Sequence, residues 1–107
     1  MPSISLHGRQ YSLPARPTVV ICIDGCDPEY ITRGIADGVC PTIADFHRRG
    51  HGGVADCVMP SFTNPNNVSI VTGVSPAVHG IGGNYYLDRE TGREIMVTDA
   101  TLLRGET

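Results

Sequence analysis

Two oxygen-bearing side chains stand where a metal-activated reaction could take place. Asp24 directly follows the apolar run 18–23, which is typical of a buried strand, and Thr63 lies in a loop that leads into a predicted helix at 65–72. Ligands in open α/β sheets gather at the carboxyl ends of the strands, so Asp24 is well placed to bind a divalent cation. Metal coordination lowers the pKa of a bound hydroxyl and makes it a nucleophile. The pair indicates phosphoryl transfer.

Each of these residues also has a structural interpretation. Asp24 precedes Gly25 and could simply cap the following turn. Thr63 could be the N-cap of its helix, and the pattern alone favours that cap over a nucleophile. Asp27 precedes Pro28 and is predicted to be a helix cap rather than a metal ligand.

Composition limits the possible partners. The chain has 107 residues, of which 40% are hydrophobic and 18% are charged, and this balance is typical of a globular protein. Its net charge is -3 and it has no basic run, so we expect no nucleic-acid partner. No apolar stretch approaches the ~20 residues that span a bilayer, and no signal-peptide pattern is present. We expect a cytoplasmic protein without membrane contact, while the oligomeric state stays open.

The four cysteines are expected to be structural thiols. None of them forms a Cys-x-x-Cys pair, and Cys22 and Cys57 lie inside apolar runs where a free cysteine usually behaves as a small buried hydrophobic residue. A reducing compartment also disfavours disulfides.

Strand and helix patterns alternate along the chain and indicate the α/β class. The runs 18–23 and 53–59 are typical of strands covered on both faces of a parallel sheet. Two or three such strands leave exposed edges, so we expect further parts of the sheet outside this chain. Within the second helix, Ile43, Phe46 and His47 are predicted to face inward. Helices are expected at 29–36, 42–49, 65–72 and from a Thr98 cap to 104, and hairpins at 4–11 and 84–97.

Three motifs occur in a characteristic order: 23–27 (Ile-Asp-Gly-Cys-Asp), 59–73 (Met-Pro-Ser-Phe-Thr-Asn-Pro-Asn-Asn-Val-Ser-Ile-Val-Thr-Gly) and 75–84 (Ser-Pro-Ala-Val-His-Gly-Ile-Gly-Gly-Asn). Together they resemble the N-terminal part of the alkaline phosphatase superfamily. The most similar branch is phosphonoacetate hydrolase, close to the nucleotide pyrophosphatase/phosphodiesterases. The diesterases usually have Thr-Phe-Pro-Asn-His-Tyr, from which 63–68 departs toward the phosphonate hydrolase form.

The resemblance covers about residues 17–107 and implies a fold and a domain arrangement. The fold is a three-layer α/β/α sandwich with a central, mostly parallel sheet, of which this chain is the N-terminal portion. Residues 1–16 would be an N-terminal extension or edge hairpin. Residues 17–107 would be the N-terminal part of the catalytic domain, truncated at its C-terminal end.

The resemblance also implies roles for individual residues. Asp24 matches the first metal ligand, and Thr63 matches the nucleophile that bridges two zinc ions. Asn84 matches the asparagine that holds a phosphoryl oxygen beside the backbone N–H of Thr63. His79, in a Pro-x-x-His-Gly-Ile turn, is expected to tie down a loop through both ring nitrogens rather than bind metal. The remaining histidines match no metal position; they are His7, His47 and His51.

The implied activity is hydrolysis of the C–P bond of phosphonoacetate to acetate and phosphate, in phosphonate catabolism. It uses two Zn²⁺ and a phosphothreonine intermediate at Thr63. The other zinc ligands and the lysines that bind the substrate carboxylate are expected beyond Thr107, so the 107-residue piece alone is expected to be inactive. One alternative is a nucleotide phosphodiesterase or pyrophosphatase, in which Tyr85 and Tyr86 hold a base instead of packing across a hairpin. A second alternative is an inactive fragment.

Overall fold

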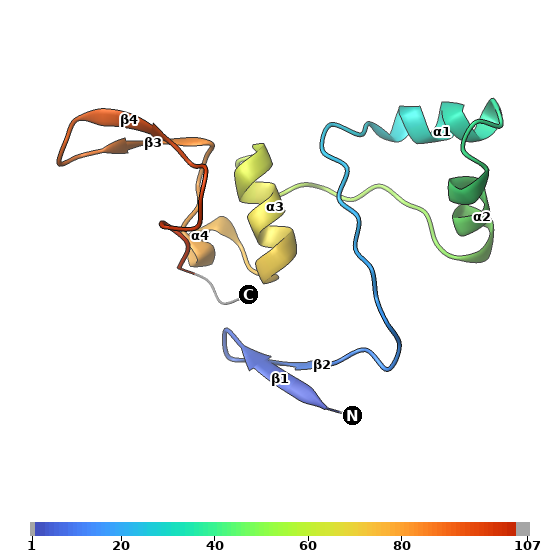
Figure 1. Cartoon of the computed structure of the whole chain (residues 1–107), viewed down its shortest axis with the longest axis horizontal. Helices are drawn as coiled ribbons and strands as arrows, with labels where there is room; N and C mark the ends of the chain where they lie inside the picture. The colour runs from blue at the N-terminus through green and yellow to red at the C-terminus, as the bar shows by residue number, and fades with distance from the viewer. Residues whose placement is uncertain (1, 105–107) are drawn as a thin grey trace. The chain divides into compact units, whose positions relative to one another are not determined.

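The computed structural model of the chain describes residues 2–104 as short helices and antiparallel hairpins joined by irregular segments (Figure 1). The chain forms two compact units, one made of Met1–Val19 with Cys57–Thr107 and the other of Val20–Asp56. No helix within the described range has the length and apolar content needed to cross a membrane. In chain order the elements are β1 (Ser3–Leu6), β2 (Arg9–Ser12), α1 (Pro28–Ala36), α2 (Pro41–Arg49), α3 (Thr63–Thr72), α4 (Pro76–His79), β3 (Tyr85–Asp88) and β4 (Arg93–Met96).

The unit Val20–Asp56 contains α1 and α2. Helix α1 begins as predicted, because the Asp27 carboxylate accepts a hydrogen bond from the backbone N–H of Glu29 at 2.8 Å and Pro28 occupies the first helical position. The predicted cap at Asp27 is therefore confirmed. Where α1 meets the start of α2, a Cβ added to Gly34 would lie only 2.8 Å from Cys40 Sγ, so a glycine is needed for this close approach.

One part of the α2 prediction is wrong. Ile43 is half-buried, but His47 is exposed and the Phe46 side chain is 60% exposed. Within this unit α1 is the only other helix, and a single short neighbour cannot cover the whole apolar face of α2.

The other unit contains the remaining elements. Its buried residues gather around α3 and α4 and include Pro65, Thr72, His79 and Ile81. Helix α3 begins at Thr63, two residues earlier than the predicted range, and ends at Thr72, with Gly73 as its C-cap. Gly73 has φ 69°, a left-handed conformation that glycine adopts without a steric penalty.

Both hairpins are confirmed. Strands β1 and β2 pair antiparallel, and β3 and β4 pair with Tyr85 opposite Met96 and Tyr86 opposite Ile95. The second turn is held by Asp88, whose carboxylate accepts hydrogen bonds from the backbone N–H of Glu90 at 3.0 Å and the hydroxyl of Thr91 at 2.6 Å. Local hydrogen bonds of this kind explain why the turns were predictable.

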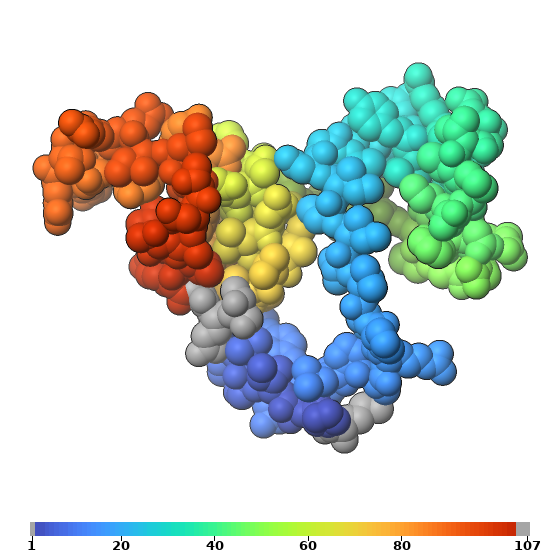
Figure 2. Space-filling view, viewed as in Figure 1, coloured from blue at the N-terminus to red at the C-terminus, as the bar shows by residue number. Residues whose placement is uncertain are grey.

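The two expected parallel strands are not formed. Segments 18–23 and 53–59 have no regular secondary structure, and apart from the half-buried Val58 their apolar side chains are open to solvent, with Val20 76% and Val54 81% exposed. Figure 2 shows the light-blue segment near residue 20 as a thin run of atoms. A strand needs a neighbouring strand to complete its hydrogen bonds, and β-branched composition alone cannot supply one.

Two further expectations are corrected. The expected helix from Thr98 is only a turn, in which the Asp99 carboxylate accepts a hydrogen bond from the Thr101 backbone N–H at 2.9 Å and the Leu103 N–H donates to the Ala100 carbonyl at 3.0 Å. The four cysteines are free thiols, but Cys22 and Cys57 are exposed, not buried, because the segments that carry them form no strands.

Candidate functional site

Thr63 is the first residue of α3. The N-cap position belongs to Phe62, whose side chain makes no capping hydrogen bond. The interpretation of Thr63 as an N-cap is therefore wrong. Its side chain is exposed, and its hydroxyl has no hydrogen-bond partner within residues 2–104. The hydroxyl thus stands at the positive end of the helix dipole and is open to a reactant.

The backbone donors of the first turn of α3 are almost all used. The N–H of Asn64 donates to Asn84 Oδ1 at 3.0 Å, Pro65 has no N–H, and the N–H of Asn66 donates to the carbonyl of Phe62 at 3.1 Å. Within the described part of the chain, the N–H of Thr63 is left without an acceptor. Helix N-termini bind anions through such free N–H groups.

Asn84 lies at the same helix end although it is 20 residues away from Asn64 in sequence. A backbone N–H can only donate, so the Asn84 atom facing Asn64 must be the carbonyl oxygen. The NH₂ group of Asn84 therefore remains as a donor. Together with the N–H of Thr63 it gives this helix end two donors for the oxygens of an anion.

Asp24 belongs to the other unit. It lies in an exposed turn that is closed by a backbone hydrogen bond of 3.3 Å from Cys26 N–H to the Ile23 carbonyl, with Gly25 at φ 72°. The turn is thus held by its backbone and by a glycine. This leaves the Asp24 carboxylate accessible.

The donor atoms fit zinc in kind but not in number. A carboxylate and a threonine oxygen are both suitable ligands, and both side chains are exposed. However, residues 2–104 contain no group of three or more His, Cys, Asp or Glu side chains that could hold a metal ion. Zinc sites in proteins take at least three protein ligands, so these two residues do not form a site by themselves.

His79 is fully buried, with 0% of its surface exposed, and both ring nitrogens are used as predicted. Nδ1 accepts the N–H of Ile81 at 3.1 Å, which places the ring proton on Nε2, 2.9 Å from the Ser69 hydroxyl. His79 therefore ties the loop after α4 to the middle of α3. It has no free nitrogen for a metal.

The charge state of His79 makes stability depend on pH. Burial lowers the pKa of His79 below its usual value, and a hydrogen bond to the Pro65 carbonyl opposes this only in part. Because the folded state binds the proton less readily than the unfolded state, stability falls as the pH drops below about 6.5.

We therefore expect the melting temperature of the wild type to fall between about pH 7.5 and about pH 5.5 by more than that of a His79→Gln variant. Glutamine keeps a donor and an acceptor but does not titrate. Thermal unfolding of both proteins at the two pH values measures the difference. Equal pH dependence of the melting temperature in both proteins would show that His79 does not contribute to the loss of stability at low pH.

Two asparagines with structural contacts were not singled out from the sequence. The Asn64 NH₂ donates to the Val97 carbonyl at 2.8 Å, and Asn66 Oδ1 accepts the N–H of Val58 at 3.2 Å. Both flank Pro65 in the first turn of α3, where asparagine is a poor helix former. The presence of poor helix formers in a predicted helix is the sequence feature that points to these two asparagines.

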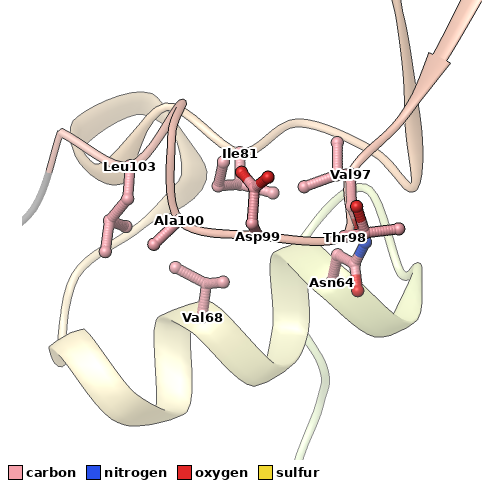
Figure 3. A pocket seen from close by; sticks show the side chains of 8 residues that line it. All are labelled: Asn64, Val68, Ile81, Val97, Thr98, Asp99, Ala100 and Leu103. Carbon is pink, nitrogen blue, oxygen red and sulfur yellow. Dashed lines mark hydrogen bonds between the residues drawn. The ribbon is translucent and has the colours of Figure 1, made fainter.

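A pocket of about 260 Å³ adjoins this end of α3 (Figure 3). Asn64, Val97 and Thr98 lie together at one end, while Val68 and Leu103 line its apolar part. The Asp99 side chain also lines it, and its pKa is lowered by hydrogen bonds from the side chain and then the backbone of Thr101. An ionised carboxylate repels an anion, so a phosphonate is not expected to bind here. Thr63 is not among the lining residues.

The family model for type I phosphodiesterase / nucleotide pyrophosphatase matches residues 18–106, and the chain belongs to this family. An uncharacterised pyrophosphatase/phosphodiesterase of Schizosaccharomyces pombe is 35% identical over 78 residues, which are 73% of this chain and 16% of that protein. An ectonucleotide pyrophosphatase/phosphodiesterase of Caenorhabditis elegans is 40% identical over 75 residues, which are 67% of this chain and 9% of that protein.

Solved structures extend the comparison to the N-terminal hairpin. The chain superposes on crystal structures of phosphonoacetate hydrolase from Sinorhizobium meliloti 1021 in complex with phosphonoformate, at 46% identity, and with phosphonoacetate, at 45% identity. In both cases the TM-score is 0.88, and the match covers 98% of this chain and 25% of the hydrolase chain. The predicted α/β class and the predicted resemblance to phosphonoacetate hydrolase are confirmed. This chain spans about a quarter of the length of those structures.

Proposed function

We propose that this chain contributes the nucleophile and an anion-binding amide to an enzyme that hydrolyses phosphonoacetate to acetate and phosphate. The observation that carries the proposal is the position of the Asn84 amide at the helix end that begins with Thr63. The choice of a phosphonate substrate is supported by 46% identity to phosphonoacetate hydrolase over 98% of the chain.

The proposed reaction begins at the Thr63 hydroxyl. Its oxygen loses a proton and attacks phosphorus, while the P–C bond breaks and its electron pair moves to the carbon. The carboxylate of phosphonoacetate delocalises this charge as an enediolate, which takes up a proton and leaves as acetate. Water then hydrolyses the phosphothreonine, releasing phosphate and restoring Thr63, so one water is consumed for each substrate.

The donors at the helix end have a defined task. As the Thr63 oxygen approaches phosphorus, negative charge builds on the phosphoryl oxygens. The free N–H of Thr63 and the NH₂ of Asn84 can donate hydrogen bonds to these oxygens. The helix dipole acts in the same direction.

We further propose two Zn²⁺ as cofactors, with Asp24 and Thr63 among their ligands. When bound, zinc lowers the pKa of the threonine hydroxyl and offsets phosphoryl charge. Because two oxygen ligands do not complete a zinc site and residues 2–104 contain no group of three or more suitable side chains, we expect the remaining ligands to come from outside these residues. We therefore expect residues 1–107 alone to be inactive.

The alternative substrate is a nucleotide diester. It is favoured by the curated relatives, which are named as pyrophosphatase/phosphodiesterases. Tyr85 and Tyr86 follow Asn84 directly, but they pair across the hairpin with Met96 and Ile95. Tyr86 is half-buried, which fits packing better than base binding.

The test is to compare the two substrates with the full-length natural product that contains these residues, supplied with zinc. We expect release of phosphate and acetate from phosphonoacetate, without comparable cleavage of a nitrophenyl nucleotide diester. Diester cleavage without phosphonoacetate turnover would assign the same residues to a phosphodiesterase. If neither substrate were cleaved, the protein would be inactive toward both substrate classes.

A further inference from the structure

Three hydrogen bonds join the start of α3 to the base of the β3–β4 hairpin in a closed ring. The backbone N–H of Asn64 donates to Asn84 Oδ1 at 3.0 Å, and the Asn64 NH₂ donates to the Val97 carbonyl at 2.8 Å. The N–H of Val97 donates to the Asn84 carbonyl at 2.8 Å and closes the ring. Asn64 therefore holds Asn84 directly through its backbone and indirectly through its side chain.

The ring determines which way the Asn84 amide faces. An asparagine side chain can turn over and exchange its oxygen with its nitrogen at little steric cost, and an anion needs the nitrogen. The N–H of Asn64 attracts only the oxygen, so the NH₂ is the group of Asn84 that is left to donate. That bond forms only while the helix end and the hairpin base stay at the right separation, which the Asn64 side chain fixes at Val97.

The surroundings strengthen this link. Asn64, Val97 and Asn84 are all half-buried, and apolar side chains that include Val68 line the pocket beside Asn64 (Figure 3). Hydrogen bonds shielded from water are stronger than exposed ones. The hydrogen bonds of the ring are therefore partly shielded from water.

We propose that Asn64 is a positioning residue whose side chain keeps the Asn84 amide oriented so that its NH₂ donates to the substrate. This inference rests on the proposed function of Asn84 and adds a residue that has no contact of its own with the substrate. Asn64 acts through Asn84, so its contribution exists only while the Asn84 amide is present.

The experiment is a double-mutant cycle in the full-length natural product, with phosphonoacetate as the substrate. We expect Asn64→Ala to lower kcat about tenfold with little change in KM, because a misplaced catalytic group costs rate more than binding. In an Asn84→Ala background, Asn64→Ala should cause no further loss. Asn64→Asp keeps the shape but cannot donate to Val97, so it should lower kcat at least as much as alanine.

Asn66→Ala is the matched control. It removes an asparagine from the same helical turn, but its hydrogen bond goes to Val58 and lies outside the ring. Its effect on kcat, whatever its size, should persist unchanged in the Asn84→Ala background. Should Asn64→Ala fail to fold, Asn64→Ser replaces it in the cycle.

The outcomes separate the two proposals. If Asn84→Ala lowers kcat but the effects of Asn64→Ala and Asn84→Ala simply multiply, the positioning role is overturned and the proposed function stands. If Asn84→Ala is as active as the wild type, the proposed role of Asn84 fails and the positioning role fails with it. Only loss of the Asn64 effect in the absence of the Asn84 amide supports the inference.

Discussion

Replacing Thr63 with alanine is expected to reduce phosphonoacetate hydrolysis by the full-length natural product to background, a loss of at least about 10³-fold in kcat. The reason is that the variant has no oxygen at the start of α3 with which to form the covalent intermediate. Because the Thr63 hydroxyl forms no hydrogen bond within the described residues, its removal should cost little stability. Phosphate release and thermal unfolding measure the two effects.

Thr63→Ser is the matched control for this prediction. Serine keeps the hydroxyl and the backbone N–H, so the variant should retain measurable turnover. The zinc content of Thr63→Ala should stay close to that of the wild type, which excludes loss of metal as the cause. Full activity in Thr63→Ala would remove Thr63 as the nucleophile.

Replacing Asn84 is expected to have the second largest effect. Asn84→Ala should lower kcat by about 10²–10³-fold, the usual result of deleting a donor that stabilises transition-state charge. Asn84→Asp should be lower still, although it keeps the oxygen that accepts the Asn64 N–H and so preserves the local structure. Aspartate places a negative charge where the phosphoryl oxygens develop theirs. Steady-state kinetics on both variants would show whether kcat is lower for Asn84→Asp than for Asn84→Ala.

The control for Asn84 is Glu90→Ala, in the exposed turn of the same hairpin. Only the backbone N–H of Glu90 takes part in the hydrogen bond to Asp88, so alanine should fold normally and keep wild-type kcat. If Asn84→Asp were as active as wild type, the Asn84 NH₂ would have no role in stabilising charge.

Elements that depend on short-range chemistry were predictable from the sequence. The Asp27 cap and Pro28 predict the start of α1, and the turn near Gly92 predicts the β3–β4 hairpin, because each uses hydrogen bonds between near neighbours. The role of His79 as a tie between two segments was also predictable from its motif. Its partner Ser69 was not, because the contact depends on how α3 and α4 pack.

Features that depend on distant partners were not predictable in the same way. Segments 18–23 and 53–59 have strand composition, but composition cannot supply the neighbouring strands that complete their hydrogen bonds. The sequence pattern predicts that this helix starts at Pro65, whereas α3 begins at Thr63 and its N-cap residue, Phe62, makes no side-chain capping hydrogen bond. This two-residue shift decides between a cap and an available hydroxyl, and the helix end that it defines is bonded to Asn84, a contact between residues that are distant in sequence.

The measurement that tests the central claim most directly is the detection of a phosphate group on Thr63. The full-length natural product would be mixed with phosphonoacetate and zinc, quenched in acid within one turnover, digested, and examined by mass spectrometry. The account predicts a phosphorylated peptide whose modified residue is Thr63 and which is absent from Thr63→Ala. Phosphate release at the normal rate without any modified Thr63, or with phosphate on a different residue, would contradict it.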